Sequence, residues 1–270
     1  MIDSPNCAGA IAEFRKRHKN RPEGTLSMLL TDSKRLATAT ARSMENDEGE
    51  KVLLITQDTM GEALVQLYMA SKGAVNPQLI EQGYTAIITS PSVREGLSIE
   101  QYTDLISSVW SINTGGSIGA AAIAQTLDRL RSICQRFLYL PETGKGFNKI
   151  TQATTPAQAR QDLELSKKPL ASQVRRSLQP DITQVTDAID WYSQDVNMWA
   201  ALVAQHNAGV WKLKETVLGL LRNEGKIITP YTLTVSAADI ATSDKAFKAA
   251  RLKIREEYET AVASAIDISE

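Results

Sequence analysis

The feature that most constrains the fold is a series of short apolar runs that alternate with stretches of helical spacing. The expected strands are residues 25–31, 51–56, 85–89, 106–112 and 136–140. They are nearly continuous in apolar residues, which is typical of parallel strands that are buried on both faces. Residues 25–141 are therefore expected to form one α/β domain, a parallel sheet with helices on both faces.

Three further segments flank this domain. Residues 1–24 hold a basic helical stretch that is either a solvated surface helix or an arm that contacts phosphates. Residues 142–180 are polar, are interrupted by prolines, and are expected to form a linker with one short helix near residues 157–165. Residues 181–270 return to helical spacing and are expected to form a mostly helical module. The basic residues of the first stretch are Arg15, Lys16, Arg17, His18, Lys19 and Arg21.

The last expected helix, residues 244–265, carries two stripes at helical spacing. The stripe expected to face inward is Phe247, Ala250, Ile254 and Tyr258. The stripe expected to face outward is Lys245, Lys248, Arg251 and Arg255. It is either a solvated face or, if the partner is a nucleic acid, a set of contacts to phosphates.

Charge and cysteine content limit the classes of protein. The 30 Lys and Arg residues nearly balance the 31 Asp and Glu residues, so any basic surface must be local. Cys7 and Cys134 lie far apart without ligating neighbours, which argues against a disulfide scaffold or a structural zinc site. The sequence contains neither an apolar run of membrane-spanning length nor a signal peptide, so a cytoplasmic protein without a membrane partner is expected.

Several common catalytic arrangements are missing from the sequence. His18 and His206 have no partners at the spacing of a catalytic triad or a zinc site, so no metal site is expected. Gly144-Lys-Gly146 attracts notice, but the phosphate-loop pattern Gly-x-x-x-x-Gly-Lys-Ser/Thr occurs nowhere in the chain. The chain is therefore not expected to bind or hydrolyse a nucleotide alone.

Two stretches could act on a nucleotide if the fold brings them together. The first, residues 89–96, is a hydroxyl-rich loop that ends at Gly96 and follows an expected strand. The second is an expected helix on which Gln125 and Arg129 lie one turn apart on one face, while Arg131 lies off that face. Both are expected at the carboxyl-end edge of the sheet, where α/β proteins bind phosphates.

In this order, the two stretches resemble the second RecA-like domain of superfamily 2 helicases. The Thr-Ser segment that ends at Gly96 corresponds to motif V of those proteins, and Gln-x-x-x-Arg corresponds to motif VI. The resemblance is closest to the helicase part of cyanobacterial-type plasmid replication proteins, the CyRepA family, and more distant to the herpesvirus origin-binding helicase. It also includes residues 29–35 and a helical tail with Trp199, His206 and Asn207, and covers most of the chain.

The resemblance implies roles for individual residues. Arg129 or Arg131 would supply the arginine finger that stabilises the transferring phosphoryl group. Gly96, Ser98 and Gln125 would lie at the nucleotide. The residues that would contact the DNA backbone are Thr31, Ser33, Thr56, Thr89 and Ser90.

This sequence departs from motif VI at two positions. Asp128 stands where the motif usually has glycine, and its carboxylate could repel phosphate or pair with Arg131. The commonest spacing in the superfamily places the finger at Ser132. The identity of the finger arginine therefore stays open.

A motor of this class needs two RecA-like halves, because the phosphate loop lies on one half and the finger on the other. The resemblance implies that ATP with Mg²⁺ is bound mainly by an N-terminal RecA-like domain, supplied in cis or in trans, and that DNA is the other partner. This chain would be part of an ATP-dependent helicase and inactive alone.

Two other functions stay open. One is a non-catalytic module that binds DNA or a protein on a helicase-like scaffold. The other is a transferase that uses the same sheet edge for a nucleotide-sugar, although no expected strand ends in a histidine or a pair of carboxylates that could act as a base.

Overall fold

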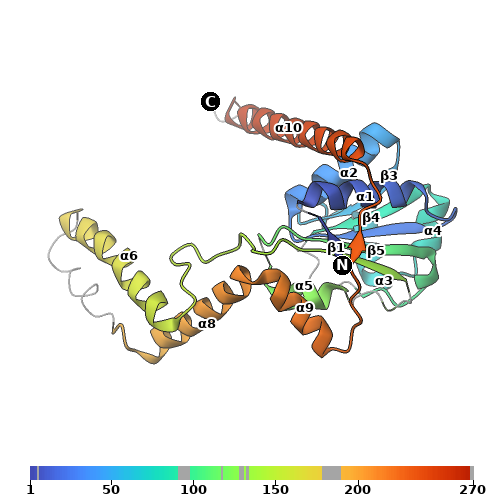
Figure 1. Cartoon of the computed structure of the whole chain (residues 1–270). Coiled ribbons are helices and arrows are strands. Elements are labelled where there is room, and N and C mark those ends of the chain that lie inside the picture. Colours follow the sequence, from blue (N-terminus) through green and yellow to red (C-terminus); the bar gives the residue numbers. More distant parts are fainter. Residues whose placement is uncertain are drawn as a thin grey trace.

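The computed structural model describes residues 1–4, 6–90, 98–116, 118–127, 131, 134–177 and 190–267. Its centre is a five-stranded, entirely parallel sheet with the strand order β3-β4-β2-β5-β6 (Figure 1). The strands are β2 (Leu26–Leu30), β3 (Lys51–Ile55), β4 (Tyr84–Thr89), β5 (Ile106–Ile112) and β6 (Gln135–Tyr139).

Helices cover both faces of the sheet. On one face lie α1 (Cys7–Lys19) and α2 (Lys34–Glu48), which share an apolar core with Trp110 of β5 and Phe137 of β6. The other face is covered by α3 (Ala63–Ser71), α4 (Asn76–Glu81), α5 (Ala120–Leu127) and α9 (Leu213–Asn223). The expected α/β class, a parallel sheet with helices on both faces followed by a mostly helical part, is confirmed.

The helical part contacts the sheet domain in two places. The long helix α10 (Ala237–Asp267) lies over α1 and α2 and then projects beyond them (Figure 1). Its inward stripe is shorter than expected: Ala250 is buried and Phe247 packs on the core, but Tyr258 is 71% exposed. The prediction that Tyr258 faces inward is therefore wrong, because this turn of the helix extends past the surface that would cover it.

A pair of helices extends away from the sheet (Figure 1). It consists of α6 (Pro156–Ser177) and α8 (Gln194–Trp211), which pack against each other. The expected short helix near residues 157–165 is thus the first part of a 22-residue helix. The division of the chain into domains at residues 24, 141 and 180 stays a prediction.

The first residues of the chain and α1 are held against the segment that precedes α10. β1 (Ile2–Asp3) pairs in parallel with β7 (Tyr231–Thr232), and the backbone N–H of Tyr231 donates to the carbonyl of Met1 at 2.7 Å. Glu13 on α1 is fully buried and accepts hydrogen bonds from Tyr231 Oη (2.6 Å) and from the backbone N–H of Thr234 (2.7 Å). The segment that leads into α10 is thereby fixed to α1.

The basic stretch of α1 is only partly solvated. Arg15 is 8% exposed and forms a 2.7 Å ion pair with Glu48, and the His18 ring lies 3.4 Å from Glu50. These carboxylates lie at the end of α2 and the start of the turn before β3. Much of the positive charge of α1 is therefore neutralised inside the protein, which the helical pattern did not reveal.

We expect buried His18 to make the stability of the protein sensitive to pH. Burial, with a contribution from Arg21, lowers the pKa of His18 from 6.5 to about 4, against the opposing attraction of Glu50. The unfolded chain takes up the proton near pH 6.5 and the folded protein does not, so stability is full above that pH and falls as the pH approaches 4. Between pH 7 and 4.5 this single group should remove roughly 2 kcal/mol from the free energy of unfolding.

Urea unfolding of the protein and of a His18→Gln variant at several pH values in this range measures the effect. Glutamine keeps an acceptor for Arg21 but does not titrate, so the difference between the two unfolding free energies should shrink as the pH falls. A difference that stays constant from pH 7 to 4.5 contradicts the assignment.

Candidate functional site

The carboxyl ends of the three adjacent strands β2, β3 and β4 carry hydroxyl side chains. Thr31, Thr56, Thr89 and Ser90 follow or end these strands, and all four are buried, with 1–5% of their surface exposed. The backbone continues the sheet here, because Thr31 N donates to Thr89 O (3.1 Å) and Ser90 N donates to Ile55 O (2.9 Å). These four residues form the buried inner layer of the carboxyl-end edge. Their contact with DNA stays a prediction.

Ser33 lies at the same edge and is half-buried. Its hydroxyl accepts a hydrogen bond from the backbone N–H of Leu36 at 3.2 Å, so it caps the start of α2. The first turn of α2 also carries Lys34, which pairs with Asp58 at 2.6 Å, and Arg35, which is exposed. A phosphate at this edge would meet a cation and a helix N-terminus together.

The edge has its switch point between β2 and β5. The chain leaves β2 through α2 on one face of the sheet and leaves β5 through α5 on the other. In open α/β sheets, ligands bind at such a point. Asp32, which follows β2, is fully buried. Its carboxylate accepts hydrogen bonds from Thr114 N (2.6 Å), Thr114 Oγ1 (3.0 Å) and Gly116 N (2.9 Å). Asp32 thus fixes the loop that follows β5. The sequence alone shows only that Asp32 comes after a strand, which does not predict this role.

Two glycine-containing loops meet beside Asp32. The backbone N–H groups of Lys145 and Gly146 donate to the carbonyl of Gly115 at 2.6 and 2.7 Å. Gly115 has a φ of +69°, and a Cβ there would lie 2.5 Å from the Cα of Gly144. Gly144-Lys-Gly146, rejected as a phosphate loop on its spacing, is therefore a partner of the loop after β5, and it presents Lys145 exposed at this edge.

We expect Gly115→Ala to destabilise the protein by about 2–3 kcal/mol, because the methyl group strains the backbone and overlaps a neighbouring main chain. Gly119→Ala is the matched control, since its Cβ meets nothing within 4 Å. Denaturant unfolding of both variants measures the two costs. Equal costs would show that the two loops do not need to approach this closely.

This edge offers donors rather than bases. Lys145 and Arg35 are exposed cations, whereas the carboxylate of Asp32 is already committed to three donors. Burial raises the pKa of the neighbouring Cys7 thiol, although the positive charge of Lys145 opposes this, so Cys7 is not an activated nucleophile. The described residues contain no group of three or more side chains suited to a metal ion. The arrangement can therefore bind an anion but supplies no acid-base pair.

The two stretches that resemble helicase motifs meet elsewhere. The backbone N–H of Arg131 donates to the carbonyl of Ile99 at 3.2 Å, one residue from Ser98. Glu100 N donates in turn to the carbonyl of Lys72, which follows α3 as the chain returns toward the start of β4. Ser98 and Arg131 therefore lie toward the amino ends of the strands. The expectation that both stretches lie at the carboxyl-end edge is wrong for these two residues.

The remaining predicted site residues are only partly described. Gln125 lies exposed on α5, where it can meet a ligand that approaches from outside. Gly96, Asp128, Arg129 and Ser132 lie outside the described residues. The Ser98 hydroxyl donates to Glu100 at 2.9 Å, and this bond, followed by the charge of Lys72, lowers the pKa of the Glu100 carboxyl. The roles of Ser98, Gln125, Arg129 and Arg131 stay predictions.

Among the described residues, no helix combines the length and the apolar character needed to cross a membrane. No protein-family model and no curated protein matches the chain. A solved structure of Mss116p bound to single-stranded RNA and AMP-PNP is similar at 11% sequence identity with a TM-score of 0.33, over 83% of this chain. This chain spans only 46% of that chain's length. At this TM-score the likeness establishes no relationship, so the α/β assignment rests on the five parallel strands themselves.

Proposed function

We propose that this chain is the second RecA-like half of an ATP-dependent DNA helicase that acts as a plasmid replication initiator. In this proposal it supplies motif V and the arginine finger of motif VI to an ATP site that it shares with an N-terminal RecA-like domain, and it contacts the DNA backbone. Its own contribution is one wall of the site, because the sequence contains no phosphate loop.

The observation that supports this most directly is the hydrogen bond from Arg131 N to Ile99 O. The end of the motif VI stretch thereby lies against Ile99, which follows the motif V stretch, although 32 positions separate Ile99 from Arg131. In a motor, the nucleotide state must reach the nucleic acid through such a contact, since motif VI senses the phosphates and motif V couples them to the strand. Coupling of this kind requires two elements that move together.

The described residues fit a nucleotide held by another domain. Gln125 and Arg131 are exposed donors that can approach phosphate groups presented from outside. ATP with Mg²⁺ would supply the reactive phosphoryl group, and its binding would depend mainly on the partner domain. Charge stabilisation by an arginine of this chain is the step that it would add.

Reconstitution tests the proposal. The chain alone should show no ATPase activity, and activity should appear when a RecA-like domain that carries a phosphate loop is added together with single-stranded DNA. Absence of activity in that mixture, with each component correctly folded and the two domains binding each other, would count against the proposal.

The alternative is a non-catalytic module that binds DNA or a protein. Asp128, in place of the motif VI glycine, favours it, because a carboxylate beside the finger repels the phosphates that it should attract. A titration of the mixture with a non-hydrolysable ATP analogue separates the two functions. Under the motor proposal DNA tightens analogue binding, whereas under the alternative DNA binds with no effect of the analogue.

A further inference from the structure

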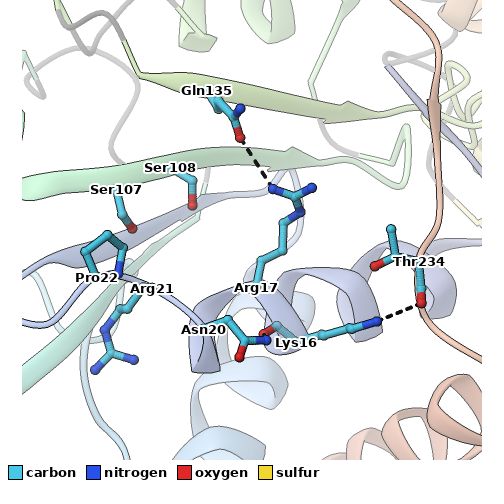
Figure 2. A pocket seen from close by; sticks show the side chains of 9 residues that line it. All are labelled: Lys16, Arg17, Asn20, Arg21, Pro22, Ser107, Ser108, Gln135 and Thr234. Carbon is cyan, nitrogen blue, oxygen red and sulfur yellow. Dashed lines mark hydrogen bonds between the residues drawn. The ribbon is translucent and has the colours of Figure 1, made fainter.

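A cavity of about 350 Å³ opens at the end of the sheet where the strands begin, opposite the carboxyl-end edge. It lies between the carboxyl end of α1 and the first residues of β5 and β6 (Figure 2). We call it the α1 pocket. Its lining residues are Lys16, Arg17, Asn20, Arg21, Pro22, Ser107, Ser108, Gln135 and Thr234.

All charged residues that line the α1 pocket are basic. Lys16, Arg17 and Arg21 are cations, and none of the nine residues is acidic. Two of these cations also face a carboxylate outside the lining: Arg17 Nε lies 3.5 Å from Glu13, and Arg21 Nη2 lies 3.7 Å from Glu50. An anion that enters the pocket therefore meets mainly Lys16 and Nη1 of Arg17, with no acidic residue in the lining.

Arg17 is held in place before any ligand arrives. Its guanidinium carbon lies over the rings of Phe137 (4.8 Å to the centroid) and Tyr231 (5.1 Å), and its Nε and Nη2 atoms donate to Tyr231 Oη at 3.0 and 2.8 Å. Its Nη1 has a weaker bond, 3.4 Å to Gln135 Oε1, and points across the pocket (Figure 2). A fixed guanidinium loses little entropy when it binds an oxyanion, and Nη1 is the nitrogen placed to donate to one.

One feature opposes anion binding and is largely cancelled. The carboxyl end of a helix carries about half a negative charge on its last carbonyls. Here Asn20 Nδ2 covers the carbonyl of Lys16 (2.9 Å), and Arg21 Nη1 covers that of His18 (2.9 Å). The charge of Lys16 then opposes what remains of the helix dipole.

Neutral donors complete the site. Ser107 and Ser108 line the wall opposite α1, and the amide of Asn20 lies at its rim (Figure 2). The Ser107 hydroxyl donates to the carbonyl of Leu26 at 3.1 Å, whereas the Ser108 hydroxyl accepts from Trp110 Nε1 at 3.0 Å and can donate its own proton to a ligand. Several cations arranged with hydroxyl and amide donors suit an anion with more than one negative charge and several acceptor oxygens. Phosphate has that chemistry, whereas a single carboxylate would leave cations unpaired.

We propose that the α1 pocket binds a phosphate group, carried either by a nucleic-acid backbone or by a small nucleotide. The site lies at the amino ends of β5 and β6, so it is separate from the carboxyl-end edge, and it does not depend on the proposed ATPase. It gives the chain a phosphate contact of its own, without a partner domain.

The test is binding by the full chain at about 50 mM salt, with a fluorescent single-stranded oligonucleotide and with inorganic pyrophosphate and AMP as separate probes. Lys16→Gln is the main variant, because glutamine can still donate to the carbonyl of Thr234 as Lys16 does at 2.7 Å. Lys19→Gln is the matched control: it removes the same charge from α1, but Lys19 faces Glu48 (3.2 Å) outside the pocket.

Lys16→Gln should weaken binding of whichever phosphate probe binds by about fivefold, the loss expected for one phosphate contact at this salt, and Lys19→Gln should have less than half that effect. Binding of the oligonucleotide alone assigns the pocket to a nucleic-acid backbone, and binding of AMP or pyrophosphate assigns it to a small phosphate ligand. Equal weakening by both variants, or no binding of any probe, overturns the proposal. Near-ultraviolet circular dichroism identical to that of the unaltered protein confirms that each variant is folded.

Discussion

Replacing Arg129 and Arg131 together with alanine should lower the DNA-stimulated ATPase of the reconstituted two-domain protein by about 10³-fold or more. An arginine finger contributes this much because it neutralises charge that develops on the transferring phosphoryl group, inside a site from which water is excluded. The double variant is needed because the sequence leaves the identity of the finger open. Steady-state ATP hydrolysis at saturating DNA measures the effect, and the two single variants then identify the finger.

The matched control is Arg222→Ala, which removes an exposed arginine from α9. It should leave the ATPase within about twofold of the unaltered protein, as is usual for an exposed side chain. If the double variant keeps its activity, neither arginine takes part in the chemistry. The chain would then be a binding module whose partner completes catalysis unaided.

Glu13→Ala should destabilise the protein by about 3–5 kcal/mol, the cost expected when a buried carboxylate is removed from its donors. Its oxygens accept from Tyr231 Oη (2.6 Å), Thr234 N (2.7 Å), Thr234 Oγ1 (2.9 Å) and Val235 N (3.1 Å), and Arg17 lies 3.5 Å away. Alanine leaves these donors without an acceptor. Urea unfolding followed by tryptophan fluorescence measures the loss.

Two further variants make this prediction specific. Glu13→Gln keeps the shape but turns an NH₂ group toward donors, so its cost should be intermediate, whereas exposed Glu23→Ala should change stability by less than about 0.5 kcal/mol. Burial alone would raise the pKa of the Glu13 carboxyl, but the hydrogen bonds from Tyr231, Thr234 and Val235 outweigh it and lower the pKa. Its stabilisation is therefore present above the ordinary glutamate pKa and is lost as the pH falls below it. If alanine and glutamine at this position cost the same as Glu23→Ala, the network is not stabilising.

The strands were the most predictable part of the fold. The run at residues 106–112 coincides with β5, because its apolar residues are bounded by polar Asp104 on one side and by Asn113-Thr114-Gly115 on the other. Burial of α1 was not predictable from helical spacing. Arg15 and His18 read as surface charges until the fold brings Glu48 and Glu50, more than 30 positions away, against them. The two-residue strands β1 and β7 are too short to leave a pattern at all.

Less of the candidate site was predictable. Hydroxyls at the ends of β2, β3 and β4 were expected from the sequence, but their burial depends on how neighbouring chain segments cover the edge. The role of Asp32 was not predicted, because a single carboxylate after a strand has many uses, and only its three hydrogen bonds to Thr114 and Gly116 reveal that it holds the loop after β5. The position of Ser98 depends on the connection between β4 and β5, and that of Arg131 on the connection between α5 and β6; no local pattern encodes where these connections run.

The contact between Glu13 and Thr234 also affects how the protein is made. The two residues are 221 positions apart, so a ribosome that adds about 5–20 residues per second needs roughly 10–45 seconds to deliver the second after the first. Throughout that interval the carboxylate of Glu13 cannot accept its hydrogen bonds from Tyr231, Thr234 and Val235, and α10 does not yet cover α1. The sheet domain therefore completes its packing only after almost all of this sequence has emerged, and a chain halted before residue 231 would leave a buried charge without its partners.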